Sequence, residues 1–181
     1  MQARKSGKLT FGEPSPSEAT LIVKGLERYL EPSAVVQLLR DKHLLIGKGN
    51  RQEVYLLSAP LWQLYEQACT QRHPYFVGLH LGELQQAGFV PSLHSLQRLA
   101  ASPRAGVVVA TTAEGAQRFM YGRDLEPNQL QQVPPKAEDR EMLVVNARGE
   151  GIGFGCLVAD KKGKTSLKNR TDLGWYLRRG Q

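Results

Sequence analysis

The sequence of 181 residues has little cysteine and no long apolar run. None of its apolar runs approaches the roughly 18–20 residues that a helix needs to cross a bilayer. The amino-terminal stretch is basic and lacks the apolar region of a secretory signal peptide. The two cysteines, Cys69 and Cys156, lie far apart in apolar surroundings, which favours buried, reduced thiols. We therefore expect a cytoplasmic protein without a membrane span.

The sequence also lacks the motifs of common catalytic and cofactor sites. Gly163-Lys164-Thr165 is similar to the end of a phosphate-binding loop, but Val158 occupies the place of the glycine required five residues earlier. The glycines of residues 149–155 do not fit the G-x-G-x-x-G spacing of a dinucleotide site, and no serine lies in a G-x-S-x-G elbow. The scattered histidines offer no metal-ligand spacing; they are His43, His73, His80 and His94. We expect no catalytic residue, no metal and no cofactor.

The basic residues are concentrated near the carboxyl-terminal end. The formal net charge is +7, and residues 161–181 hold seven basic residues against one acidic residue, Asp172. A clustered excess of this kind is typical of proteins that bind polyanions. A solvated basic tail is the alternative. However, Leu167, Trp175 and Tyr176 interrupt the run, so we expect the segment to fold and to hold its charges in place. The distribution favours nucleic acid as the partner.

The amino-terminal part predicts an α+β domain at residues 15–102, preceded by a flexible basic arm at residues 1–14. Ser15 and Glu18 form the pattern of a capping box, which predicts a helix that ends before Pro32. Apolar runs and a Gly-Lys-Gly-Asn turn then predict strands at residues 35–39, 44–46 and 53–57, the last two forming a hairpin. A helix after Ser58, a strand at 75–82, an extended segment at 88–91 and a helix after Ser92 follow. We expect a small antiparallel sheet with about three helices.

Residues 103–181 predict a second domain made largely of strands. A strand at 107–110 precedes a helix that Thr112 caps and Gly122 ends. Further strands are expected at 142–145 and 152–159, joined by a turn. In the second of these, Gly151, Gly153 and Gly155 recur at every second residue and share one face. A face without side chains permits a sharp barrel bend or the close approach of a second backbone, from protein or from nucleic acid.

The candidate contacts with nucleic acid are basic and aromatic side chains of this second domain. Lysine and arginine neutralise phosphates and release counterions, while aromatic rings and guanidinium planes stack on unpaired bases. The basic candidates are Lys161, Lys162, Lys164, Lys168, Arg170, Arg178 and Arg179, together with Arg118 and Arg123 around the glycine-terminated helix. The aromatic candidates are Phe119, Tyr121, Trp175 and Tyr176. Of these, Phe119 and Trp175 have apolar neighbours at helical spacing, which favours a place in the core for both.

Three pieces of the second domain carry a resemblance to a known family. They are GAQRFMYGRDL at residues 115–125, GIGFGCL at 151–157 and LKNRTDLGWYLRRG at 167–180. In this order they resemble the PUA domain, a small β-barrel that binds RNA and is named for pseudouridine synthases and archaeosine transglycosylases. With the preceding α+β domain, the chain looks like the small two-domain ribosome biogenesis factor of the large subunit, the Nip-seven type, in its archaeal form.

The resemblance implies a non-catalytic assembly factor. Its PUA domain would bind pre-ribosomal or U-rich RNA, and its amino-terminal domain would bind other assembly or RNA-processing proteins. Archaeal members carry basic residues just before the final helix, which places this role on Lys164, Lys168 and Arg170. In a eukaryotic source the location would be nucleolar. Two alternatives remain open: an RNA-targeting accessory subunit of an RNA-modifying enzyme, and a protein-interaction module that docks an acidic partner.

Overall fold

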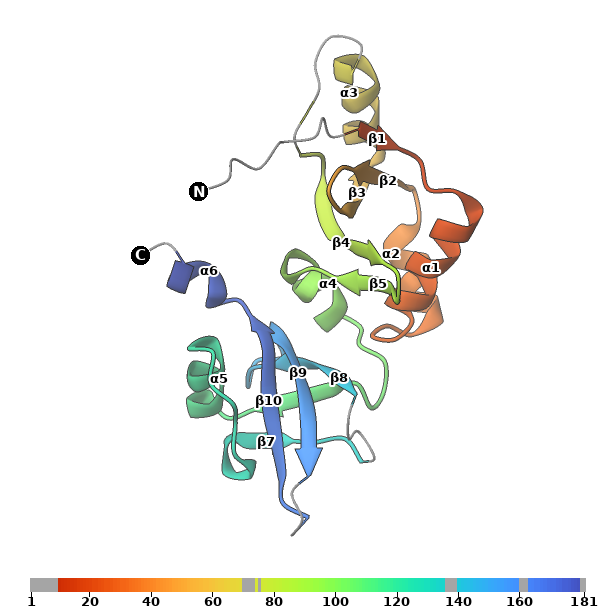
Figure 1. The fold of residues 1–181 in the computed structure, drawn as a ribbon. Coiled ribbons are helices and arrows are strands. Elements are labelled where there is room, and N and C mark those ends of the chain that lie inside the picture. The colour runs from red at the N-terminus through yellow and green to blue at the C-terminus, as the bar shows by residue number, and fades with distance from the viewer. Residues whose placement is uncertain (1–9, 70–73, 75, 136–139, 160–162, 180–181) are drawn as a thin grey trace. The chain divides into compact units, whose positions relative to one another are not determined.

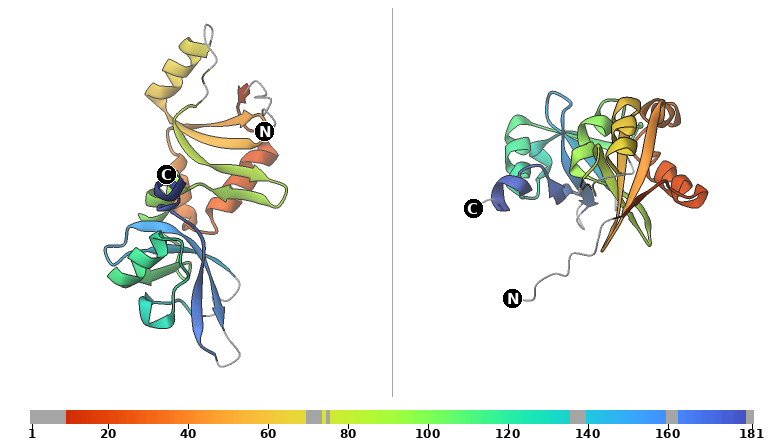
Figure 2. Two further views of the ribbon diagram at one scale, coloured as in Figure 1. Left: turned by 60° about the vertical axis from the view of Figure 1, so that its left-hand side comes forward. Right: turned by 90° about the horizontal axis from the view of Figure 1, so that it is seen from above.

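The computed structural model describes residues 10–69, 74, 76–135, 140–159 and 163–179 (Figure 1; two further views in Figure 2). It divides into two compact units. The first comprises the described residues up to Leu26 together with Val35–Ser95, and the second comprises Glu27–Ala34 and the described residues from Leu96 onward. The predicted domain limits, 15–102 and 103–181, stay a prediction. Among the described residues, no helix has the length and apolar character of a membrane span.

The first unit is built on a five-stranded antiparallel sheet with the order β1-β2-β3-β4-β5. Helix α1 packs against β5, and α3 packs on β2 and β3. The strands are β1 Thr10–Gly12, β2 Lys42–Lys48, β3 Gln52–Ser58, β4 Leu79–Gln85 and β5 Gly88–Pro91. The helices are α1 Pro16–Leu26, α2 Pro32–Leu39, α3 Ala59–Cys69 and the short 3₁₀ helix η1 Leu93–Ser95. The first turn of α2 belongs to the second unit.

Local signals predicted most of this unit correctly. The capping box is present, because the Ser15 amide donates to Glu18 Oε2 at 2.8 Å and the Glu18 amide donates to Ser15 Oγ at 3.3 Å. The β2–β3 hairpin and α3 are also confirmed. The strand expected at residues 35–39 is wrong, because these residues belong to α2. Pro32 occupies the first position of that helix, where its missing N–H is not needed.

The second unit is built on a curled five-stranded sheet with the order β10-β9-β8-β6-β7 (Figure 1). Strands β6 and β8 are parallel, and the other neighbours are antiparallel. The strands are β6 Val108–Thr111, β7 Leu130–Gln132, β8 Glu141–Val145, β9 Gly151–Ala159 and β10 Thr165–Asp172. The helices are α4 Leu96–Ala100, α5 Ala113–Met120, η2 Pro127–Gln129 and α6 Trp175–Arg179. Its core contains the buried Val109, Phe119, Leu125, Met142, Val144, Ile152, Leu157 and Leu167.

The glycines of β9 allow another protein strand to approach closely. A Cβ atom on Gly153 would lie 2.2 Å from the carbonyl oxygen of Thr171 and 2.7 Å from the ring of Phe119. One on Gly155 would lie 2.9 Å from the carbonyl oxygen of Lys168. The sequence left open whether the approaching backbone belongs to protein or to nucleic acid. At Gly153 and Gly155 it belongs to the protein strand β10.

Tyr29 anchors residues 27–34 in the second unit. Its side chain is 1% exposed, and its ring packs edge-on against Phe154 at a centroid distance of 5.4 Å. Its hydroxyl donates to the carboxylate of Glu141. Burial, together with this carboxylate, raises the pKa of Tyr29 far above its ordinary value, so the hydroxyl stays protonated.

Candidate nucleic-acid interface

Helix α5 has the ends that the sequence predicted. Thr112 is its N-cap, and Thr112 Oγ1 accepts a hydrogen bond from the Gly115 amide at 3.0 Å. Gly122 follows the helix at a φ of +77°, a conformation that favours glycine. The chain can therefore turn sharply after Tyr121 and present the next residues, Arg123 onward, beside the sheet.

The segment after α5 lies along the basic strand β10. The backbones of Leu125 and Leu167 exchange two hydrogen bonds, at 2.8 and 2.9 Å. The amide side chain of Asn169 donates to the carbonyl oxygen of Phe119 at 2.7 Å. These bonds bring residues 115–125 next to the basic run, although about forty residues separate the two in the sequence.

A β-bulge decides which side chains of β10 face solvent. Asn169 pairs with Gly155 and Thr171 with Phe154, so Arg170 is the additional residue. In a regular strand Lys168, Arg170 and Asp172 would all share one face. The bulge resets the alternation, so that Lys168 and Arg170 are exposed while Asp172 is buried.

Two of the predicted lysines form ion pairs with carboxylates of the segment after α5. Lys164 Nζ lies 2.8 Å from Glu126 Oε2, and Lys168 Nζ lies 2.8 Å from Asp124 Oδ2. Partial burial acts to raise the pKa of Asp124, but hydrogen bonds from Lys168 and the Asn169 amide outweigh it and hold that pKa below its ordinary value. Exposed pairs of this kind contribute only about 0.2–1 kcal/mol. A phosphate could therefore replace either carboxylate at little cost.

Three of the predicted arginines form no ion pair with a carboxylate of the described residues. Among the residues that the structure describes, no carboxylate lies within 4.0 Å of Arg118, Arg123 or Arg170, and all three are exposed. Arg118 and Arg123 line a hollow of about 380 Å³ together with Tyr121, whose side chain is 65% exposed. Two guanidinium groups beside an exposed ring suit a phosphate next to an unpaired base.

Arg178 is engaged inside the unit. Its guanidinium forms two parallel hydrogen bonds of 2.9 Å with Asp172, which is 2% exposed, and also donates to the carbonyl oxygen of Met120. These bonds fasten α6 to the end of α5. In the same helix, the expectation that Trp175 is in the core is wrong, because 39% of its surface is exposed; Phe119 is buried as expected.

Three of the predicted basic contacts are not placed, whereas the predicted aromatic contact Tyr176 is exposed. Lys161 and Lys162 lie outside the described residues, as does the side chain of Arg179. The partners that sequence reasoning missed are Asp124 and Glu126, because their pairing depends on a contact between segments far apart in the chain. Within the described ranges, no group of three or more His, Cys, Asp or Glu side chains could hold a metal ion.

Known proteins of similar sequence match both parts of the chain. The family model for the UPF0113 PUA domain matches residues 107–181, and the model for the NIP7/UPF0113 pre-PUA domain matches residues 12–93. A UPF0113 protein from Aeropyrum pernix is 33% identical over 190 residues, covering 99% of each chain. One from Archaeoglobus fulgidus is 26% identical over 177 residues, covering 94% of this chain and 95% of that protein.

Solved structures show the same fold. A conserved PUA domain protein from Thermoplasma acidophilum has a TM-score of 0.58 at 14% identity and covers 94% of this chain and 99% of that one. A PUA domain protein from Aeropyrum pernix, solved as a tartrate complex, has a TM-score of 0.59 at 12% identity, with coverages of 98% and 96%. The predicted fold class, an α+β chain that ends in a PUA domain, is confirmed. With family models matching both parts and a relative at 33% identity over almost its whole length, the chain belongs to the UPF0113/NIP7 family of pre-PUA and PUA domain proteins.

Proposed function

We propose that this protein binds RNA through a surface formed by the end of α5, the segment after it and β10. We call this surface the basic face; it consists of Arg118, Tyr121, Arg123, Lys164, Lys168 and Arg170. The observation that carries the proposal is the contact between residues 115–125 and β10, which groups exposed cations from two distant stretches. Phosphate neutralisation by such a group gives binding that weakens steeply with salt.

The RNA that this surface suits is unpaired, and the family resemblance adds the expectation that it is rich in uridine. Tyr121 offers an exposed ring in the hollow that Arg118 and Arg123 also line, and a ring of this kind can stack on a base that is not held in a duplex. In an RNA double helix the bases are paired and stacked on one another, so this ring could not stack on them. The proposal includes structured RNA only where a loop or bulge presents such a base.

The role that fits the family is assembly of the large ribosomal subunit, without catalysis and without a cofactor. Two matches support this role. Residues 12–93 match the NIP7/UPF0113 pre-PUA model, and a UPF0113 relative matches the chain over almost its whole length. The first unit would then bind other assembly or RNA-processing proteins. Sequencing the RNA that crosslinks to the protein in its native cell tests this role, and recovery of pre-ribosomal RNA is the expected result. Co-purification with an RNA-modifying enzyme in place of ribosomal precursors would contradict it.

Salt dependence separates RNA binding from the docking of an acidic protein. We expect the logarithm of the affinity for a U-rich oligonucleotide to fall linearly with the logarithm of salt concentration, by about 0.7 for each phosphate contact on a single strand. Fluorescence anisotropy at several salt concentrations measures this slope. If the protein binds acidic peptides but not U-rich RNA, the basic face is not an RNA site.

Removing the two carboxylates of the basic face should strengthen RNA binding. In Asp124→Asn with Glu126→Gln, Lys168 and Lys164 lose the ion pairs with these two carboxylates, which then no longer compete with phosphates for the lysines. At 0.1 M salt we expect affinity to rise by up to about fivefold for each lysine, with a steeper salt slope. The matched control is Glu13→Gln with Glu66→Gln, which changes net charge equally at exposed positions of the first unit. Equal gains in both proteins would mean that net charge alone acts.

A further inference from the structure

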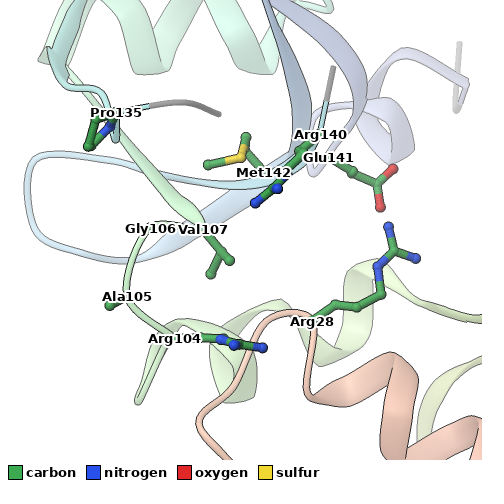
Figure 3. Close-up of a pocket in the computed structure, with 9 residues that line it drawn as sticks. All are labelled: Arg28, Arg104, Ala105, Gly106, Val107, Pro135, Arg140, Glu141 and Met142. Carbon is green, nitrogen blue, oxygen red and sulfur yellow. The ribbon is translucent and has the colours of Figure 1, made fainter. Parts of the chain in front are cut away.

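A second cluster of arginines surrounds a hollow of the second unit (Figure 3). The hollow has a volume of about 670 Å³ and is lined by Arg28, Arg104 and Arg140 together with Glu141. We call it the arginine pocket. Its walls come from the connection between α1 and α2, from the segment before β6 and from the start of β8. None of its lining residues belongs to α5, β10 or α6, so it is distinct from the basic face.

Two hydrogen bonds, one of them between backbone atoms, join the two walls that carry Arg28 and Arg104. The Arg104 amide donates to the carbonyl oxygen of Tyr29 at 2.7 Å, and the Ala105 amide donates to Glu31 Oε1 at 3.2 Å. Tyr29 itself is fixed in the core by its ring and its hydroxyl. Arg28 therefore lies in the chain next to a buried and hydrogen-bonded residue, which limits the ordering cost of binding a ligand.

The pocket holds an excess of positive charge that the described residues do not neutralise. Figure 3 shows the guanidinium of Arg28 and the carboxylate of Glu141 pointing toward each other. That carboxylate already accepts the hydroxyl of Tyr29. No carboxylate among the described residues comes within 4.0 Å of Arg28, Arg104 or Arg140. Arg104 uses one N–H on the carbonyl oxygen of Glu27, at 3.1 Å.

Guanidinium groups in this arrangement suit a phosphate group. Each carries five N–H donors and no acceptor, and the planar fork matches two oxygens of one phosphate. A phosphate would provide acceptors for donors from three separate segments at once. We propose that the arginine pocket binds a phosphate group of the RNA backbone, as a second contact that fixes the orientation of the RNA held by the basic face. This proposal rests on the proposed function.

The test is the RNA affinity of the full chain carrying Arg28→Ala and Arg140→Ala. Arg104 is left in place because it also bonds to the backbone of Glu27. For the loss of this one phosphate contact we expect affinity for a U-rich RNA to fall about fivefold at 0.1 M salt and the salt slope to become shallower by about 0.7. The matched control is Arg98→Ala with Arg148→Ala, two exposed arginines of the same unit outside the pocket. Melting temperatures of both proteins check that folding is intact.

The outcomes separate this proposal from the one on which it rests. Equal affinities and slopes for the pocket variant and its control would overturn the pocket alone, while the proposed function would stand. Failure of the unaltered protein to bind RNA would overturn both. Inorganic phosphate tests whether the pocket binds a free anion instead of a phosphate of the RNA backbone. If phosphate shields Arg28 and Arg140 from an arginine-specific reagent and RNA does not, the pocket takes free anions and the proposal is wrong.

Discussion

Replacing Lys164, Lys168 and Arg170 together by glutamate should weaken binding of U-rich RNA by at least about a hundredfold at 0.1 M salt. Loss of three phosphate contacts accounts for that factor, at about fivefold each. The new carboxylates at positions 164 and 168 would also lie beside Glu126 and Asp124, where like charges repel one another and the RNA. The salt slope should become shallower by about 2.

The binding is measured by electrophoretic mobility shift and by anisotropy across salt concentrations. The matched control reverses Lys24, Arg40 and Lys42, three exposed cations of the first unit, and changes net charge by the same amount. A neutral version with glutamine at positions 164, 168 and 170 separates lost attraction from new repulsion. Mobility shifts left unchanged by the reversal would remove these residues from the site.

Substitution of Gly153 by alanine should destabilise the second unit by about 3 kcal/mol. The added Cβ atom would lie 2.2 Å from the carbonyl oxygen of Thr171 and 2.8 Å from the Cα atom of Asp172. Both neighbours are backbone of β10, so relief requires the strand to move. Such movement would also disturb the buried Asp172, which holds Arg178 and with it α6.

Hydrogen exchange of β9 and β10 amides and thermal melting measure the effect. Exchange reports on the second unit by itself, which matters because a chain of two units need not unfold in one step. The control is Gly12→Ala, since a Cβ at Gly12 would meet no atom within 4 Å. Protection of β9 and β10 equal to that of the unaltered protein would show that β10 can shift without cost.

The sequence predicted elements whose signals are local. The capping box at Ser15 and the helix limits at Thr112 and Gly122 depend on residues a few positions apart, and the structure has them. The run at residues 35–39 predicts a strand in error, because four apolar residues around Gln37 are too few to separate the period of a strand from that of a helix. The apolar neighbours of Trp175 predict a buried helical face, but 39% of its surface is exposed.

The geometry around the basic residues depends on contacts that no local pattern reveals. Lys168 and Asp124 are 44 residues apart, and Lys164 and Glu126 are 38 apart. The spacing of the charges in the sequence predicted a basic cluster, but not which cations would be paired. The bulge at Arg170 breaks the two-residue alternation, so a count along the strand would have exposed Asp172 with the cations.

Residues 27–34 leave the ribosome long before their packing partners. The hydroxyl of Tyr29 bonds to a carboxylate 112 residues later. At about 5–20 residues per second of synthesis, this interval lasts roughly 6–22 s. During that time the aromatic ring and the adjoining Leu30 have no native core to enter, which leaves apolar surface open to chaperones or to aggregation. The core of the second unit is therefore completed late in translation. A fragment that begins at residue 96 would lack the part of that core which residues 27–34 contribute.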